Sequence, residues 1–159
     1  MSKITLITVG NLKEEYLKDA YAEYKKRLSQ FAKVDEVNIK EEQIKNENDE
    51  TEIGRALDLE GQKILSLVPH GASVFALCVE GREYDSISLS KEISSSIDKC
   101  GKLVFIIGSS HGLSETVKEK ADYRLSVSRL TFPHQLMRVL LSEILYRSFT
   151  IINGKKYHK

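Results

Sequence analysis

The stretch FIIGSSHGLS, residues 105–114, joins an apolar run to a glycine-rich turn and then to the start of a helix. The apolar run is typical of a buried strand that ends at Gly108. Glycines let the backbone approach a ligand closely, and the free amides near Ser114 favour polar or anionic groups. Any strand-to-helix connection can have this composition, so a plain tight turn remains the simpler interpretation. The stretch lacks the lysine of a nucleotide P-loop and the spacing of a dinucleotide-binding turn.

The same succession of strand and helix extends along the rest of the chain. Short apolar or alternating runs predict strands over residues 4–9, 33–39, 73–79 and 103–107. Helical spacing of apolar residues predicts helices over 12–28, 53–68, 89–99, 114–120 and 133–149. We expect the first strand to lie centrally and the second at an edge. This order favours an α/β fold with a largely parallel sheet covered by helices on both faces.

Length and charge limit the number of domains and the kinds of partner that the chain can have. The 159 residues, 41% of them hydrophobic, suffice for one compact domain and are too few for two ordinary ones, so we expect a single domain over residues 1–159. The formal charge of +1 is uneven, because seven Lys or Arg stand against Glu143 alone from Arg124 onwards, a net of +6. A basic end suits a phosphate-facing patch, although a solvated tail is the commoner explanation.

Several classes of protein are disfavoured. The start MSKITLITVG lacks the apolar core of a signal peptide and no segment has membrane-spanning length, so we expect a cytoplasmic protein. Cys78 and Cys100 are predicted to be reduced thiols, with Cys78 in the core. The four histidines lack the spacing of metal ligands, so no metal is expected, and His134 is predicted to bond to nearby backbone. The acid-rich stretch 41–50 is predicted to be a loop, because it lacks the glycine and ligand spacing of a calcium site.

The C-terminal stretch LSVSRLTFPHQLMRVLLSEILYRSFTIINGKKYHK, residues 125–159, is the second place where chemistry is expected. Pro133 suits the first turn of a helix. That helix is apolar around much of its circumference, which indicates burial between the sheet and a second subunit. Glu143 and Arg147 are spaced as an ion pair. In the tail, the ring of Tyr157 among lysines is suited to stacking on a base while the cations hold phosphates, although short basic tails are usually just solvated.

Taken together, FIIGSSHGLS, LSVSRLTFPHQLMRVLLSEILYRSF and the terminal YHK closely resemble the 23S ribosomal RNA large-subunit pseudouridine N3-methyltransferase family, which has the SPOUT fold. The stretches ITLITVGNLKEEYLKDAYAEYKKRL and FALCVEGREYDS are also similar, so the resemblance covers the whole chain except the acidic loop after Ile39. It implies a mostly parallel α/β sheet with a C-terminal trefoil knot, an exception to the rule that chains are unknotted. It also implies a homodimer that transfers a methyl group from S-adenosylmethionine to N3 of a pseudouridine in 23S rRNA.

The resemblance further implies which residues form the site. The cofactor pocket is expected at Leu77, Gly108 and the segment Val127, Ser128, Arg129, Leu130, Thr131 and Phe132. On the substrate side we expect Arg138 to hold a phosphate or stabilise the developing imide anion, Tyr157 to stack on the base and His158 to accept the proton.

Two positions depart from the family pattern. The family usually has glycine where this chain has Ser109, which is expected to alter the backbone slightly beside the cofactor. Leu130 replaces a frequent methionine of similar volume, a change expected to be neutral.

Two other interpretations stay open at this point. One is a knotted methyltransferase that acts on transfer RNA, and the other is a non-catalytic ribosome-binding module without affinity for the cofactor. The modest overall charge favours assembled ribosomes over free RNA as the substrate, because surface fit would supplement a small basic patch.

Overall fold

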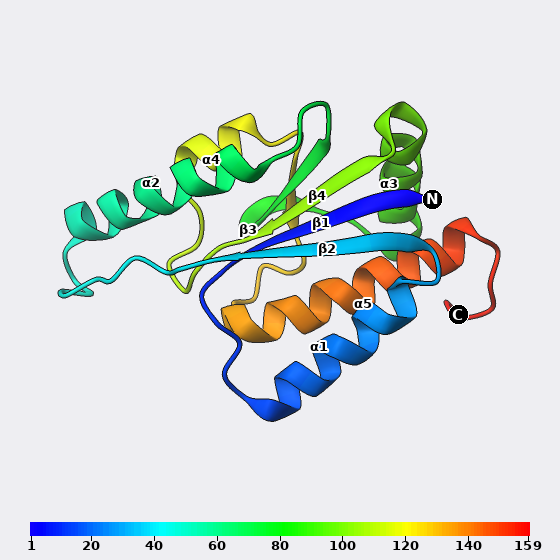
Figure 1. The fold of residues 1–159 in the computed structure, drawn as a ribbon, viewed down its shortest axis with the longest axis horizontal. Coiled ribbons are helices and arrows are strands. Elements are labelled where there is room, and N and C mark those ends of the chain that lie inside the picture. Colours follow the sequence, from blue (N-terminus) through cyan, green and yellow to red (C-terminus); the bar gives the residue numbers. More distant parts are fainter.

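The computed structural model describes residues 1–159 and contains one five-stranded sheet between two layers of helices (Figure 1). All neighbouring strands are parallel, in the order β2-β1-β4-β3-β5. The strands are β1 (Ser2–Val9), β2 (Ala32–Ile39), β3 (Ser73–Glu83), β4 (Lys102–Ile107) and β5 (Tyr123–Ser126). The helices are α1 (Glu15–Leu28), α2 (Glu50–Leu67), α3 (Ser86–Cys100), α4 (Glu115–Lys120) and α5 (His134–Ile152).

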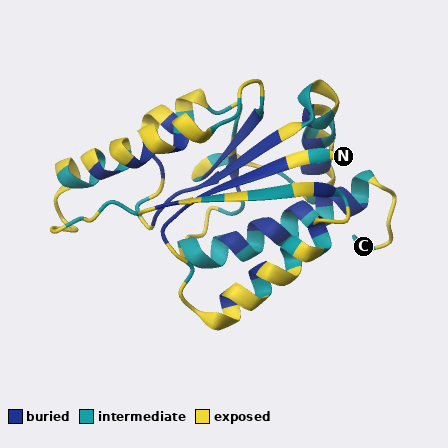
Figure 2. Cartoon of the chain, viewed as in Figure 1, coloured by how far each residue is buried: buried dark blue, intermediate teal, exposed yellow.

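The predicted α/β class is confirmed, and so is the edge position of the second strand. The first strand is internal, but the central place belongs to β4. Strand β4 explains this arrangement, because five consecutive apolar residues, 103–107, are all buried and can supply core on both faces. Phe105 and its alternate neighbours face α1, α3 and α5, whereas Val104 and Ile106 face α2 and α4. Figure 2 shows the inner strands buried along most of their length and the outer helix faces exposed.

Side-chain caps decide where two of the helices begin. The Asp49 carboxylate accepts the N–H groups of Thr51 and Glu52 at 3.0 and 3.2 Å, so α2 starts before the first apolar residue of its stripe. The Ser114 hydroxyl accepts the N–H of Val117 at 3.3 Å and caps α4. The acid-rich stretch before α2 forms no helix or strand up to Asp49, as predicted.

The pairing of β3 with β5 is the main feature that sequence patterning did not reveal. Strand β5 has only four residues, YRLS, too few to show a periodicity, and it was not predicted. Its partner β3 is longer than predicted because pairing resumes at Arg82 after a bulge over residues 78–81. A Cβ at Gly81 would lie 2.7 Å from the Arg124 carbonyl oxygen, so the bulge closes against β5 only with glycine at that position.

The bulge also corrects the prediction for one cysteine. Cys78 is only half-buried and lines a cavity at the end of β3 instead of lying in the core. Both Cys78 and Cys100 are free thiols. Helix α5 runs to Ile152, beyond the predicted end at Phe149. None of the helices combines the length and the hydropathy that crossing a bilayer requires.

Candidate cofactor and substrate site

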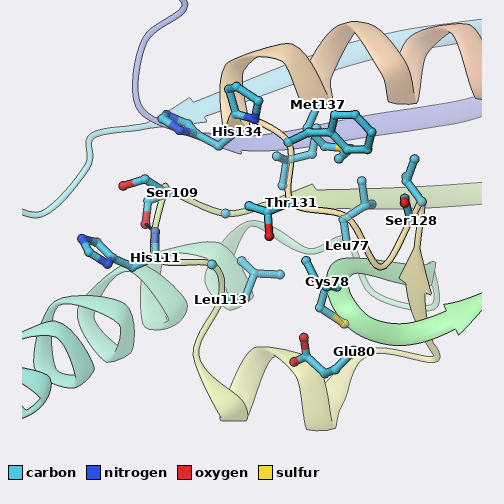
Figure 3. Close-up of a pocket in the computed structure, with 18 of the residues that line it drawn as sticks. Leu77, Cys78, Glu80, Ser109, His111, Leu113, Ser128, Thr131, His134 and Met137 are labelled. Carbon is cyan, nitrogen blue, oxygen red and sulfur yellow. Dashed lines mark hydrogen bonds between the residues drawn. The ribbon is translucent and has the colours of Figure 1, made fainter.

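A cavity of about 620 Å³ lies at the carboxyl ends of β3, β4 and β5 (Figure 3). This volume is in the range of small-molecule sites, roughly 300–1,000 Å³. Its walls come from residues 77–80 at the bulge of β3, residues 107–113 from the end of β4 to the start of α4, and much of the segment 125–137. Figure 3 shows Leu77, Leu113 and Thr131, one from each segment, converging on the cavity. Ligands of parallel α/β sheets bind at this end of the strands.

The cavity brings together most of the residues predicted to hold the cofactor. Arg129 alone among them does not line it, and its side chain is exposed. Residues 77–80 of β3 reach the cavity because β3 pairs directly with β4. The predicted residues that line the cavity are Leu77, Gly108, Val127, Ser128, Leu130, Thr131 and Phe132.

The turn after β4 is too tight for a side chain at Gly108. A Cβ there would lie 2.2 Å from the Gly112 carbonyl oxygen and 3.0 Å from the Leu113 side chain. The Gly112 N–H donates to the Ser109 carbonyl at 2.9 Å, and Gly112 itself has a φ of +87°. Ser109 fits without a positive φ, and its hydroxyl accepts the His111 N–H at 3.3 Å. The serine therefore adds a hydrogen bond to the turn at no cost in backbone conformation.

A buried carboxylate that sequence reasoning missed lies beneath this turn. Glu60 of α2 is 3% exposed, and its Oε2 accepts the Glu42 N–H at 2.9 Å, whereas its Oε1 has no partner. Burial raises the pKa of Glu60, an effect that the Glu42 amide and the Ser109 hydroxyl oppose. Nothing in the sequence marked this glutamate, because it falls at an ordinary position of a helix rich in charged residues.

Two contacts between side chains frame the cavity. Lys118 of α4 pairs with Glu80 of the β3 bulge at 2.6 Å, and both line the cavity. His111 of the turn meets Glu47 of the acidic loop at 2.6 Å, so the loop that resembles nothing in particular contacts the site.

The two other titratable groups on the wall are shifted by burial. Burial raises the pKa of the Cys78 thiol, with a further contribution from the Glu80 carboxylate. Burial lowers the pKa of His134, whose ring makes no hydrogen bond to backbone, contrary to the prediction. Both groups are therefore held in their neutral forms against the cavity.

Arg138 lies outside the cavity, within the core-facing side of α5. Its side chain is 3% exposed, and one guanidinium nitrogen donates to the Val9 carbonyl at 3.1 Å and also to that of Gly10. Its Nε has no partner, and burial lowers its pKa. In the single chain, Arg138 thus ties the end of β1 to α5.

The tail residues Tyr157 and His158 lie together along the second half of α5. Glu143 and Arg147 form the predicted ion pair at 2.7 Å, and the Tyr157 hydroxyl donates to the same Glu143 oxygen at 3.2 Å. Arg147 also donates to His158 Nδ1 at 3.3 Å. Because a guanidinium can only donate, Nδ1 is the acceptor and Nε2 carries the hydrogen.

Part of α5 separates this tail cluster from the cavity of the same chain. The cluster is held by Glu143 and Arg147, which follow His134 by nine and thirteen residues and therefore lie roughly 14 and 20 Å along the helix from its start. The helix starts beside the cavity, and the chain ends near its opposite end (Figure 1). The structure does not bring Tyr157 or His158 to the cavity within one chain. It also groups no three or more His, Cys, Asp or Glu side chains that could hold a metal ion.

Comparison with known proteins identifies the family. A family model described as "Predicted SPOUT methyltransferase" matches residues 2–158. The chain is 46% identical over 158 residues to ribosomal RNA large subunit methyltransferase H of Streptococcus pneumoniae strain CGSP14, covering 99% of each protein. The protein of the same name from S. pneumoniae strain TIGR4 matches equally well.

The fold has a counterpart among solved structures. A probable methyltransferase from Bordetella pertussis Tohama I superposes with a TM-score of 0.56, covering 93% of this chain and 96% of that one at 12% identity. At that identity the likeness concerns the fold alone. The family model and the curated relatives both cover the chain almost end to end. The chain therefore belongs to the SPOUT methyltransferase family, whose enzymes use S-adenosylmethionine as the methyl donor.

Proposed function

We propose that residues 1–159 act as a single SPOUT methyltransferase domain that methylates N3 of a pseudouridine in 23S rRNA on assembled ribosomes. The observation that carries the proposal is the 46% identity, over 99% of both chains, to relatives named as methyltransferases of the large-subunit ribosomal RNA. The stretch TFPHQLMR and the terminal YHK add the resemblance to the pseudouridine N3 family. This substrate implies a cytoplasmic protein with ribosomal RNA as its partner.

The chemistry of the cavity fits the methyl donor. S-adenosylmethionine supplies a methyl group on a positively charged sulfur and also has a flat base, an amino group and a carboxylate. Apolar side chains such as Leu77 and Phe132 suit the base, and the Glu80–Lys118 pair offers one charge of each sign to the amino acid part. Gly108 is buried in the tight turn, whose residues line the cavity. We therefore assign cofactor binding to Leu77, Gly108 and the segment from Val127 to Phe132.

The proposal includes a homodimer, for which two features argue. Helix α5 has apolar side chains that one chain buries only partly, among them Leu136, Leu140 and Ile144. A second copy that packs against them would complete their burial. A second copy is also the simplest way to bring Tyr157 and His158 to a cavity, because α5 holds them far from their own. The trefoil knot that the resemblance implies belongs to the same proposal.

The substrate nitrogen must lose its proton before it can attack the methyl group. We assign His158 to take that proton, Tyr157 to stack on the base, and Arg138 to support the site. His158 Nδ1 accepts a hydrogen bond from Arg147, and Nε2 carries the hydrogen. His158 can therefore take a proton only after its contact with Arg147 is released, so the tail must rearrange when substrate binds.

We propose a structural role for Arg138 in place of the expected phosphate contact. With its guanidinium buried against the Val9 and Gly10 carbonyls, it supports the site by holding the end of β1 and α5 in place. Direct contact with a phosphate would require these hydrogen bonds to break, at a cost of about 1.5–3 kcal/mol for bonds to a charged group.

The test is methyl transfer from labelled S-adenosylmethionine to ribosomes that lack the modification, with the methylated nucleoside identified by mass spectrometry. We expect 3-methylpseudouridine in 23S rRNA, and no such product with the Tyr157→Ala/His158→Ala double variant. Product on transfer RNA instead would replace the substrate and keep the enzyme class. Unchanged turnover of the double variant would remove the tail from the mechanism.

A further inference from the structure

A second cavity, of about 430 Å³, lies between the extended end of β3 and the edge strand β5. We call it the edge groove, and its lining includes Arg82, Tyr84, Tyr123 and Arg124. Glu80 lines both the edge groove and the cofactor cavity, so only the β3 bulge separates the two. An RNA strand with a nucleotide at the cofactor cavity can therefore pass over the bulge into the edge groove.

The carboxylates of the edge groove are already engaged, whereas its arginines are not. Glu80 is paired with Lys118 at 2.6 Å, and Asp122 accepts the Val74 N–H at 2.7 Å. Arg82 and Arg124 are exposed, and neither makes an ion pair. The edge groove therefore offers two exposed guanidinium groups without an ion-pair partner beside the cofactor cavity, while Asp122 is the one lining carboxylate that has no cation partner.

Aromatic rings fix the geometry of this charged surface. The Arg82 guanidinium lies over the Tyr84 ring, 4.5 Å from its centre, which leaves the edge of the guanidinium free to donate. Tyr123 stacks on the buried Phe75 with ring centres 4.3 Å apart. Guanidinium edges hold phosphate oxygens well, and rings of this kind stack on bases. This combination matches a ribose–phosphate chain better than a small free anion, which needs an enclosed site.

We propose that Arg82, Tyr84 and Arg124 form a subsite for the backbone of the substrate RNA next to the nucleotide being methylated. The proposal rests on the proposed function, which makes RNA the substrate, and adds where that RNA leaves the site. Most specific contacts to RNA involve unpaired segments whose bases are splayed out. The edge groove would hold the phosphates that flank such a splayed nucleotide while its base lies beside the methyl donor at the cofactor cavity.

The test compares an Arg82→Ala/Arg124→Ala double variant with Arg55→Ala, which removes an exposed, unpaired arginine from α2. We expect the double variant to raise the KM for ribosomes about tenfold or more, equivalent to about 1.4 kcal/mol of binding free energy. Its S-adenosylmethionine affinity and melting temperature should stay at the wild-type values. The slope of log KM against log salt should fall by about one for each phosphate that the variant no longer binds. Arg55→Ala should change none of these quantities.

The possible results separate the two proposals. If wild-type protein methylates ribosomes and the double variant has the same KM and salt slope, the subsite is wrong and the proposed function stands. If wild-type protein binds the cofactor but methylates no ribosomal RNA, the proposed function fails and the subsite with it. An Arg82→Lys/Arg124→Lys variant should recover part of the affinity, because charge is kept while the two-pronged geometry is removed. No recovery at all would count against phosphate binding.

Discussion

Replacing Gly108 by alanine tests the turn that forms one wall of the cofactor cavity. The added Cβ would lie 2.2 Å from the Gly112 carbonyl oxygen and 2.6 Å from its carbonyl carbon. Real Cβ atoms essentially never approach within 3.0 Å of another heavy atom, so the turn must open by roughly 1 Å. The clashing atoms are backbone and cannot rotate away as a side chain would. We expect the free energy of unfolding to fall by about 1–3 kcal/mol, the usual cost of overpacking.

The same displacement should weaken cofactor binding. Gly108 and Gly112 both line the cavity, so opening the turn changes the surface that the ligand meets. We expect the dissociation constant of S-adenosylmethionine to rise at least about tenfold, because weakening the binding free energy by about 1.4 kcal/mol suffices for that change. Urea unfolding measures the stability, and titration calorimetry measures the binding.

The matched control is Gly54→Ala in α2. A Cβ at Gly54 has no heavy atom within 4 Å, and the residue has no positive φ. Alanine inside a helix should stabilise the protein by about 0.5–1 kcal/mol and leave cofactor affinity unchanged. If Gly108→Ala behaved like this control in both assays, the turn would be neither as tight nor as close to the cofactor as we argue.

Side chains around the turn and the cavity give three further expected outcomes. Burial raises the pKa of the Glu60 carboxyl above its ordinary 4.5, so the folded state binds the carboxyl proton more tightly than the unfolded chain does. Above the raised pKa, the ionised carboxylate therefore disfavours folding. Glu60→Gln should therefore be more stable to urea than the wild type at neutral pH, and the difference should shrink as the pH falls towards 4.5; a difference that does not change with pH would contradict this. Arg138→Met leaves two buried carbonyls without their donor and should lower the free energy of unfolding by about 1–3 kcal/mol, and an unchanged urea midpoint would contradict the role we assign it. Because burial raises the pKa of Cys78, iodoacetamide should alkylate this thiol slowly at neutral pH, and more slowly still when S-adenosylmethionine is bound. A hydrogen bond with Ser73 lowers the pKa of Cys100, so Cys100 should react faster and at a rate that does not depend on the cofactor. Peptide mass spectrometry measures both rates, and equal protection of the two thiols would refute this.

Sequence patterning predicted most of the fold because long apolar runs decided it. Strand β4 is buried on both faces and reads as an uninterrupted apolar run, so its existence and its internal place follow from composition. Strand β5 could not be found in that way, since three of its four residues, Tyr123, Arg124 and Ser126, carry polar groups. Its place in the sheet depends on pairing across the bulge with β3, a contact between residues far apart in the chain.

The candidate site also contains residues that could be predicted from the sequence and one that could not. The rule that turns after parallel strands meet at one edge of the sheet pointed to residues 105–114, whereas the resemblance to the family supplied the eight residues proposed for cofactor binding, seven of which line the cavity. Glu60 was not predictable, because its burial results from α2 packing closely on the turn and on α4. A Cβ at the adjacent Gly61 would lie 2.4 Å from the Ser114 hydroxyl, which shows how close that packing is.

The tail gives the strongest argument that one chain is only part of the site. Glu143 and Arg147 satisfy the polar groups of Tyr157 and His158 along the second half of α5, so the tail has well-defined contacts without any substrate. A base that accepts the substrate proton must exchange the charge-assisted Arg147 contact for a bond from the neutral imide N–H, which is the weaker of the two. The other contacts of the RNA must therefore offset this exchange, once a second copy brings a cavity to the tail. A device of this sort ties proton removal to arrival of the RNA, because without RNA the acceptor nitrogen of His158 stays occupied.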